Sequence, residues 1–517
     1  GAIQYRESKL FLDNSATNSE KLSRGKLIAH ETAHMWFGDL VTMKWFNDVW
    51  MKEVFANFMA DKIMNPAFPD INHNLQFLTA HYSSAYDEDR TKGSHSIRQN
   101  LTNLKNAGSL YGSIIYNKAP IMMRQLETTM GKEVFQKGIQ KYIQKYANSN
   151  ADWEDLVEIL DKGTTLNMKK WSDVWVNQSG RALFTDHIEY GDAQTIKNFV
   201  LRQQAEDGSP NVWPQIFEIG LVYPDTIKVI QVNVNSRITE IKEAIGLQKP
   251  ISVIYNYNGY GYGVFPIDPN NLDKTPEIKD EVARAYSYIN AYENTLTGKI
   301  TAVKAFDVFV KGIAVEQNEL IVKLLSNQLS SIFWDFLTIK QQVVAQAELE
   351  QLLFNKLQTE LPSNIKKTIF GLFESIAYSK TGKEKLYQIW NKEIAIANLK
   401  LNEDDYINMA MDLAIYNHER SDEIVRKTRA VISNLDKRKR FDFLLPSLSN
   451  DLGLRDAFME SLKLQENREK EAWVQVALAN VHHPLRQDSS KKYLKECLGL
   501  IEEVQLTGDI FFPKGWL

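Results

Sequence analysis

Two histidines four residues apart, followed by a distant glutamate, constrain the fold of this chain more than any other feature. The segment His-Glu-Thr-Ala-His occupies positions 30–34, and Glu53 follows after eighteen further residues. Residues four apart on a helix lie on one face, so His30 and His34 can present two ring nitrogens to one ion. Residues 21–37 contain no proline and precede a glycine, which predicts a helix over this range.

A second helix has to bring Glu53 to the same ion. Residues 47–64 are compatible with a helix, and they must pack antiparallel to the first one after a short turn around residues 39–45. A catalytic zinc usually takes three protein ligands and leaves one position for water. The pattern therefore predicts one zinc ion per chain, held by His30, His34 and Glu53.

Glu31 is left free to act as a general base. Because it is adjacent to His30 on the helix, it points beside the metal, where a base can take a proton from the attacking water. Zinc lowers the pKa of a bound water to about 7, so a carboxylate can complete the activation at neutral pH. The alternative is a chance His-Glu-x-x-His pattern on an ordinary helix, and a third ligand at a suitable position argues against it.

The residues around this motif resemble the zinc aminopeptidases of the aminopeptidase N type, which are gluzincin metallopeptidases. The resemblance covers His-Glu-Thr-Ala-His-Met-Trp-Phe-Gly-Asp-Leu-Val-Thr-Met at 30–43 and Trp-Phe-Asn-Asp-Val-Trp at 45–50. That family also has a Tyr-x-Lys-Gly-Ala motif, and Tyr-Asn-Lys-Ala-Pro at 116–120 is similar. The resemblance implies that Tyr116 stabilises the transition state, since an unperturbed phenol is protonated near pH 7 and can donate to an oxyanion. Weaker similarities lie at residues 1–7, 94–97 and 175–180.

The chain departs from the family pattern in three places. Lys52 and Val54 flank the third ligand, where the family usually has asparagine and glycine. Ala119 and Pro120 replace glycine and alanine after the tyrosine motif, which predicts a stiffer backbone. The Gly-x-Met-Glu-Asn segment, whose glutamate anchors the substrate amine in this family, is absent, so we expect the chain to begin inside a catalytic domain and to lack the amino-terminal β domain.

The resemblance implies a zinc-dependent aminopeptidase that hydrolyses the amino-terminal peptide bond of peptides. In this role Glu31 is the general base on the zinc-bound water and Tyr116 stabilises the oxyanion. Two alternatives stay open: a thermolysin-like zinc endopeptidase, and a catalytically weak metal-binding scaffold, which Lys52, Val54 and the missing anchor favour. The sequence singles out no substrate-binding residue.

Composition excludes several other classes of protein. The 517 residues carry a formal net charge of −4, which gives no electrostatic footprint for nucleic acid or an anionic membrane. No apolar run reaches the roughly 18 residues of a membrane span. Cys497 is the only cysteine, which excludes an internal disulfide and predicts an inert, buried thiol. We expect a soluble protein, cytoplasmic or periplasmic/secreted, and the oligomeric state stays open.

The patterning predicts a multidomain α+β chain. Residues 1–180 are expected to form a thermolysin-like, mainly helical catalytic domain, incomplete at its start. Residues 181–268 are expected to form a small antiparallel β-sandwich, because valines at 229, 232 and 234, and then residues 251–257, alternate near period two. Residues 269–517 are expected to form an all-α superhelical domain of the HEAT/armadillo type.

Three smaller patterns have structural interpretations. Stripes such as Val282, Ala285, Tyr286 and Ile289 recur at helical spacing and are expected to be core faces. The glycines within residues 259–263 predict a turn or bulge between strands, since no Gly-Lys-Ser/Thr follows to make a phosphate loop. The basic residues 437–440 are expected on a solvated helix face, in preference to a contact with nucleic acid or a peptide carboxylate.

Overall fold

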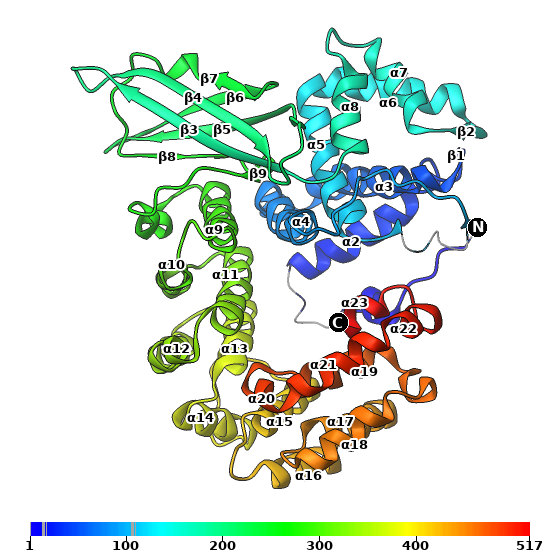
Figure 1. The fold of residues 1–517 in the computed structure, drawn as a ribbon, viewed down its shortest axis with the longest axis vertical. Coiled ribbons are helices and arrows are strands. Elements are labelled where there is room, and N and C mark those ends of the chain that lie inside the picture. The colour runs from blue at the N-terminus through cyan, green and yellow to red at the C-terminus, as the bar shows by residue number, and fades with distance from the viewer. Residues whose placement is uncertain (1, 13–15, 17, 105–107, 109) are drawn as a thin grey trace. The chain divides into compact units, whose positions relative to one another are not determined.

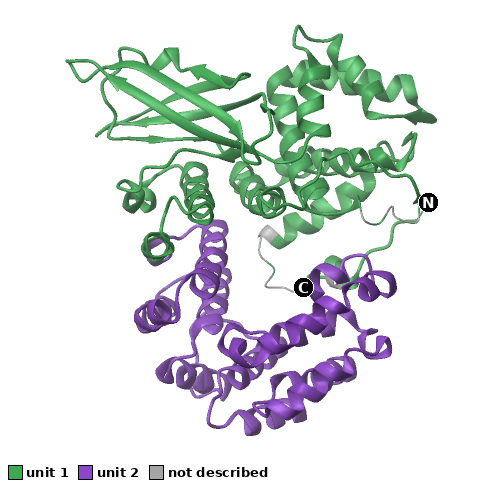
Figure 2. Cartoon of the chain, in the orientation of Figure 1, with its two compact units in different colours: residues 1–312 green, residues 313–517 purple. Residues whose placement is uncertain are grey.

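The computed structural model describes residues 2–12, 16, 18–104, 108 and 110–517, and these form two compact units. Figure 2 shows unit 1, residues 1–312, in green and unit 2, residues 313–517, in purple. Unit 1 combines helices with small sheets and unit 2 is helical, which confirms the predicted mixed α+β class with a long helical carboxy-terminal region. The proposed domain boundaries at residues 180 and 268 stay predictions.

The first part of unit 1 is mainly helical, as predicted, and its short strands β1 (Val41–Met43) and β2 (Ser149–Ala151) pair in parallel (Figure 1). The helices are α1 (Glu7–Leu10), α2 (Asn18–Ala33), α3 (Val49–Met64), α4 (His73–Asp89), α5 (Ala119–Met130), α6 (Lys132–Tyr146), α7 (Trp153–Asp161) and α8 (Met168–Asn177), with the short turns η1 (Phe46–Asp48) and η2 (Asn65–Ala67) and the π-helix η4 (Ile114–Lys118).

Helices α2 and α3 pack antiparallel, as the sequence predicts. Lys26, in the middle of α2, pairs with Asp61 near the end of α3 at 2.6 Å, whereas His30 near the end of α2 meets Glu53 near the start of α3. Helix α2 ends at Ala33, four residues before the predicted end. Tighter turns follow, and the chain reverses at Gly38, whose φ of +138° favours glycine.

Two small sheets follow in the order β7-β4-β3-β9 and β6-β5-β8, and all their strand pairs are antiparallel except β3 with β9. The rings of Phe184, Phe217 and Phe265 meet between them, with centroids 4.5–5.7 Å apart, so the sheets share an aromatic core. The strands are β3 (Ala182–Tyr190), β4 (Ile196–Ala205), β5 (Gln215–Val222), β6 (Ile227–Val234), β7 (Ile238–Glu240), β8 (Ser252–Ile254) and β9 (Gly263–Val264), with the turn η5 (Lys242–Ala244).

Strand β6 lies in the predicted antiparallel region, and its side chains alternate between a buried and an exposed face. Val229 is 43% exposed, and the inward face of the strand consists of Ile230, Val232 and Val234. The glycine-rich segment before β9 is a turn between strands, as predicted. A Cβ atom on Gly263 would lie 2.4 Å from the carbonyl oxygen of Ala182, so only glycine allows β9 to approach β3 this closely.

The chain from residue 272 onward is helical, and the predicted stripe on α9 is buried. Within unit 2 the helices pack mainly against neighbours one or two positions along the chain. The helical elements are η6 (Leu272–Glu277), α9 (Glu281–Leu296), α10 (Ala302–Val315), α11 (Glu319–Ser331), the π-helix η7 (Ile332–Phe336), α12 (Ile339–Gln358), α13 (Ser363–Ile376), α14 (Lys380–Trp390), α15 (Glu403–Ile415), α16 (Ser421–Val431), α17 (Leu435–Leu448), α18 (Leu452–Ser461), η8 (Gln465–Arg468), α19 (Glu471–Val481), η9 (Pro484–Arg486), α20 (Gln487–Ser490), η10 (Lys491–Tyr493), α21 (Leu494–Gly499), α22 (Ile501–Thr507) and α23 (Phe512–Trp516).

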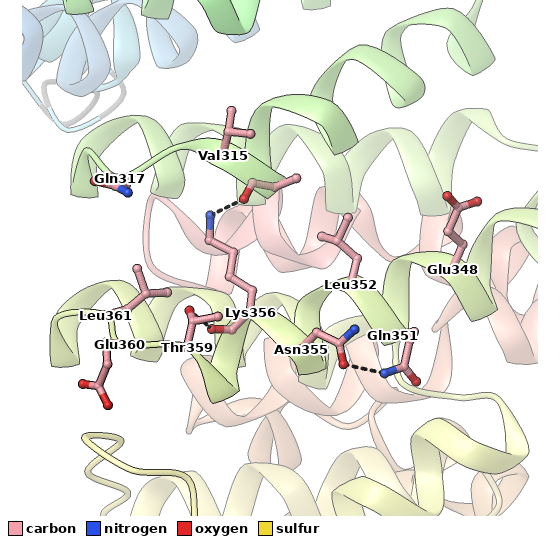
Figure 3. A pocket seen from close by; sticks show the side chains of 11 residues that line it. Val315, Gln317, Glu348, Gln351, Leu352, Asn355, Lys356, Thr359, Glu360 and Leu361 are labelled. Carbon is pink, nitrogen blue, oxygen red and sulfur yellow. Dashed lines mark hydrogen bonds between the residues drawn. The ribbon is translucent and has the colours of Figure 1, made fainter.

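Unit 2 contains a pocket of about 730 Å³ between the end of α10 and helix α12. Figure 3 shows the Lys356 side chain extending from α12 toward the end of α10. Its ammonium donates hydrogen bonds to the carbonyl oxygens of Ile313, Ala314 and Glu316 at 2.5, 3.1 and 2.9 Å. Lys356 therefore caps the carboxy-terminal end of α10, where carbonyl groups have no partners within the helix.

Three further sequence expectations concern single features. Cys497 is buried, and burial raises the pKa of its thiol, in agreement with an inert side chain. In the basic cluster, Lys437 pairs with Asp404 at 2.8 Å, and Arg438 donates to the carbonyl oxygen of Ile432. Over the described part of the chain, every helix is too short or too polar to cross a membrane.

Candidate metal centre

Three side chains from α2, the turn after it and α3 converge on one point. The Nε2 atoms of His30 and His34 lie 3.1 Å apart, and Oε2 of Glu53 lies 3.4 Å from the first and 3.8 Å from the second. Among the residues that the structure describes, no other group of three or more His, Cys, Asp or Glu side chains is arranged to hold an ion. The three predicted ligands are therefore brought together.

The spacing and the hydrogen bonds of these side chains fit a zinc ion. Ligands at about 2.0–2.2 Å from a tetrahedral zinc lie about 3.4 Å from one another, which is close to the three distances observed. The Nδ1 atom of His34 donates to the carbonyl oxygen of Phe37 at 3.1 Å, and Nδ1 of His30 contacts Oδ1 of Asn57 at 2.8 Å. When both protons are on Nδ1, the two Nε2 lone pairs and a carboxylate oxygen face one another, an arrangement that a bound cation would satisfy.

The two oxygens of Glu53 have different surroundings. Oε2 faces the imidazoles, whereas Oε1 lies 3.5 Å from the ammonium of Lys52. Burial raises the pKa of Glu53, but the hydrogen bond with His30 and the charge of Lys52 outweigh it and lower the pKa below its ordinary value. Glu53 is thus ionised at neutral pH, as a zinc ligand must be. Val54, the other departure from the family pattern, is fully buried.

Glu31 lies on α2 next to the first histidine and is half-buried. Its charge contributes, after larger effects of burial and of Glu53, to the pKa values of His30 and Tyr116. The role of Glu31 as general base stays a prediction.

Tyr116 lies in the π-helix η4 and is 36% exposed. Its ring stacks on Tyr111 with centroids 6.2 Å apart. Burial raises the pKa of Tyr116, and the charges of Glu53 and Glu31 raise it further, so the phenol keeps its proton at neutral pH. The structure therefore brings a phenolic donor into the electrostatic field of the candidate zinc ligand and the candidate base.

Sequence reasoning missed several residues that support this site. Asn57 follows Glu53 by four residues on α3, so the spacing rule that links His30 to His34 could have identified it. Lys118 and Asp89 form a fully buried ion pair beside Tyr116, and no local spacing predicts that pair. The Nδ1 atom of His95 contacts the carbonyl oxygen of Ser96, and His95 lies outside the ligand group, as expected.

The paired helices and their His-His-Glu triad define a metallopeptidase domain, and the comparisons identify its family. The profile of the peptidase family M1 domain matches residues 1–175. Residues 1–175 thus carry a peptidase family M1 domain, in agreement with the resemblance to the aminopeptidase N type.

Several relatives of the chain are named as aminopeptidases. It is 27% identical over 350 residues to aminopeptidase N of Streptomyces lividans, covering 63% of this chain and 40% of the relative. It is 26% identical over 340 residues to probable aminopeptidase 1 of Sulfurisphaera tokodaii, covering 65% and 41%. Over 181 residues it is 36% identical to puromycin-sensitive aminopeptidase of Caenorhabditis elegans, covering 35% and 19%. The chain thus spans about two fifths of the length of the first two relatives.

Proposed function

We propose that this chain is the zinc-binding part of an aminopeptidase that hydrolyses the amino-terminal peptide bond of peptides. His30, His34 and Glu53 hold one zinc ion. The observation that carries the proposal is the convergence of these three ligand atoms at 3.1–3.8 Å, with each imidazole engaged through its other nitrogen. The names of the relatives support removal of amino-terminal residues over internal cleavage.

The residues around the triad divide the reaction between them. A zinc ion bound there supplies a Lewis acid that polarises the scissile carbonyl and makes water acidic near neutral pH. Glu31 takes the proton of the attacking water and then delivers it to the nitrogen of the departing amine. The phenol of Tyr116 donates a hydrogen bond to the oxyanion that forms on the carbonyl oxygen.

Substitution of the base tests the chemistry. We expect Glu31→Gln to lower turnover roughly 10²–10⁴-fold while the zinc content is retained, because the amide cannot accept the proton of the attacking water. Glu133→Gln, at an exposed glutamate on α6, is the matched control and keeps full turnover. Turnover by Glu31→Gln equal to that of the unaltered protein would overturn the assignment.

Blocked substrates test the exopeptidase assignment. The alternative thermolysin-like endopeptidase uses the same zinc chemistry and has no requirement for a free amine. Peptides with free and with acetylated amino termini are compared at equal concentration, with and without a chelator. Equal, chelator-sensitive cleavage of both favours the endopeptidase. No chelator-sensitive cleavage of either peptide favours the metal-binding scaffold.

We also propose the finer fold assignments. Residues 1–180 form the thermolysin-like catalytic domain, residues 181–268 the β-sandwich and residues 269–517 the HEAT/armadillo-like superhelix. The shared aromatic core of the two sheets and the neighbour-to-neighbour packing of the unit 2 helices support this division. Limited proteolysis tests it: protected fragments that end near residues 180 and 268 are expected, and cleavage that ignores these positions would contradict it.

A further inference from the structure

The backbone that carries Tyr116 has an unusual conformation. Tyr116 lies in η4, a π-helical turn whose last bond runs from the N–H of Ala119 to the carbonyl of Ile114. Single π-turns inside helices are rare and occur often at functional sites. A wider turn packs its own backbone less well than an α-helix, so side chains outside the turn must hold it. The residues that follow Tyr116 provide two such attachments.

The first attachment is a fully buried ion pair. The ammonium of Lys118, the last residue of η4, lies 2.7 Å from Oδ2 of Asp89 at the end of α4, and neither side chain is exposed. The ammonium also donates to the carbonyl oxygen of Gly180 at 2.8 Å. Tyr262 and Ser94 donate to the two carboxylate oxygens of Asp89 at 2.8 and 2.7 Å. Both charges are therefore satisfied inside the protein.

The second attachment involves the residue between Tyr116 and Lys118. The ring of His81 on α4 is half-buried, and its Nδ1 lies 3.2 Å from Oδ1 of Asn117. Two consecutive residues of the π-turn, Asn117 and Lys118, are thus attached to one helix, at two places eight residues apart on α4.

Lys118 is too enclosed to meet a substrate, so a direct chemical role is excluded by its burial. A buried ion pair is also weak evidence for stability, because an apolar pair of the same size often stabilises as well. An ion pair does, however, fix the relative positions of its two side chains, because specific atoms must meet. Here it fixes Lys118, which lies two residues after Tyr116.

We propose that Lys118 and Asp89, supported by Tyr262, are positioning residues that hold the π-turn so that Tyr116 meets the oxyanion. This inference rests on the proposed function, in which Tyr116 contacts the reacting carbonyl. The three residues act through Tyr116 alone, and they leave the zinc ligands on α2 and α3 undisturbed. Their loss therefore lowers turnover only as long as the Tyr116 hydroxyl is present.

A double-mutant cycle tests the proposal in the whole chain. The disruptive variant is Lys118→Met with Asp89→Asn, which removes both charges together so that none is left buried alone. The milder variant is Tyr262→Phe, which removes one hydrogen bond to Asp89. Each is made with and without Tyr116→Phe, and kcat, KM and zinc content are measured for all folded variants.

We expect Tyr116→Phe alone to lower kcat roughly 10²–10³-fold, the usual effect of removing one oxyanion donor. Tyr262→Phe is expected to lower kcat about three- to tenfold with unchanged KM and zinc content, and to have less than about a twofold effect once Tyr116 is phenylalanine. Tyr255→Phe is the matched control, because Tyr255 is a buried tyrosine that donates to Asp186 at 2.6 Å in the sheets. It should leave kcat unchanged.

The outcomes separate failure of this inference from failure of the proposed function. A normal kcat for Tyr116→Phe removes the oxyanion role and the inference with it. A low kcat for Tyr116→Phe, with the same fold-loss from Tyr262→Phe in both backgrounds, leaves the function intact and overturns the positioning role. Loss of zinc from Tyr262→Phe also overturns it. If the Lys118→Met, Asp89→Asn variant does not fold, Tyr262→Phe decides the question.

Discussion

The two units neutralise their buried positive charges in different ways. In unit 1, Arg181 is 1% exposed and meets the carboxylates of Glu293 and Glu206, each at 2.6 Å. In unit 2, Arg486 is 7% exposed and donates to the carbonyl oxygens of Ser447 and Leu448, both at 2.7 Å, at the end of α17. Arg181 of unit 1 is thus paired with carboxylates, whereas Arg486 of unit 2 caps a helix end. Arg468 of unit 2 differs from Arg486, because it also meets the carboxylate of Glu503.

The two cations also differ in the chain separation of their most distant partners, although Glu206 is only 25 residues from Arg181. Arg181 and Glu293 are separated by 112 residues, and Arg90 reaches the same carboxylate across 203. In unit 2, Arg486 and Ser447 are 39 residues apart. Neighbouring helices expose carbonyl ends with a partial negative charge, so a solenoid-like chain can satisfy a buried cation without importing a carboxylate. In unit 1, segments that are distant in the sequence pack together, and the ion pairs of Arg181 and Arg90 with Glu293 lie where they do so.

The largest expected effect comes from breaking an ion pair in unit 1. Arg181→Met leaves the buried Glu293 with Arg90 as its remaining ion-pair partner among the described residues, so we expect the free energy of unfolding of unit 1 to fall by about 3–5 kcal/mol. Hydrogen exchange read by mass spectrometry in increasing urea follows the two units separately. Arg429→Met, which removes an exposed pair with Asp442, is the control and should change nothing measurable. An equal loss in unit 2 would contradict the comparison.

A smaller effect is expected from pH, and in unit 1 we assign it to Asp48. Burial raises the pKa of Asp48 to about 6 from 3.8, although Arg98 lies 2.9 Å away, and its Oδ1 has no hydrogen-bond partner among the described residues. The folded state therefore binds the proton more tightly than the unfolded one. This contribution to stability is full below pH 3.8 and is lost as the pH rises through 6.

Urea unfolding at pH values from 4 to 7 measures this contribution. We expect it to be about 2–3 kcal/mol at most, because two pKa units correspond to that range. In Asp48→Asn the step between pH 4 and 6 should disappear from unit 1. A step of the same size that persists in Asp48→Asn would show that another group titrates.

The smallest effect is expected from removing a cap in unit 2. Arg486→Met leaves carbonyl groups at the end of α17 without a donor and leaves no charge unpaired, so the loss is about 1–2 kcal/mol. Hydrogen exchange should accelerate around α17 and η9 and stay unchanged in α11 to α13. A loss as large as that of Arg181→Met would remove the distinction between the two units.

The sequence predicts those parts of the site whose arrangement depends on residues close together in the chain. Helical spacing places His30 and His34 on one face, and a single chain reversal brings Glu53 to them, so the ligand set follows from residues 30–53. The same rule finds the buried stripe on α9 in the helical region. In β6 the limit of such rules is visible, because alternation alone does not say which of the neighbours Val229 and Ile230 faces inward, and the structure buries Ile230.

The parts that sequence does not predict depend on long-range packing. The amino-acid sequence of residues 114–118 does not distinguish a π-turn from an α-helical turn, because contacts with other parts of the chain determine which of the two forms. Lys118 finds Asp89 and Tyr262 only after α4 and the sheets have packed. The end of α2 at Ala33 likewise reflects the reversal into β1, which propensity alone places later.

The compact layout of the ligands has a consequence for synthesis. His30, Glu31, His34 and Glu53 lie on one helical hairpin, whereas Tyr262, which holds Asp89, is at a position translated 209 residues after Glu53. At about 5–20 residues per second, roughly 10–40 s separate the two on the ribosome. The four residues of the hairpin are therefore synthesised well before Tyr262 is available to hold Asp89, so we expect metal binding to be possible before the turn that carries Tyr116 is fixed.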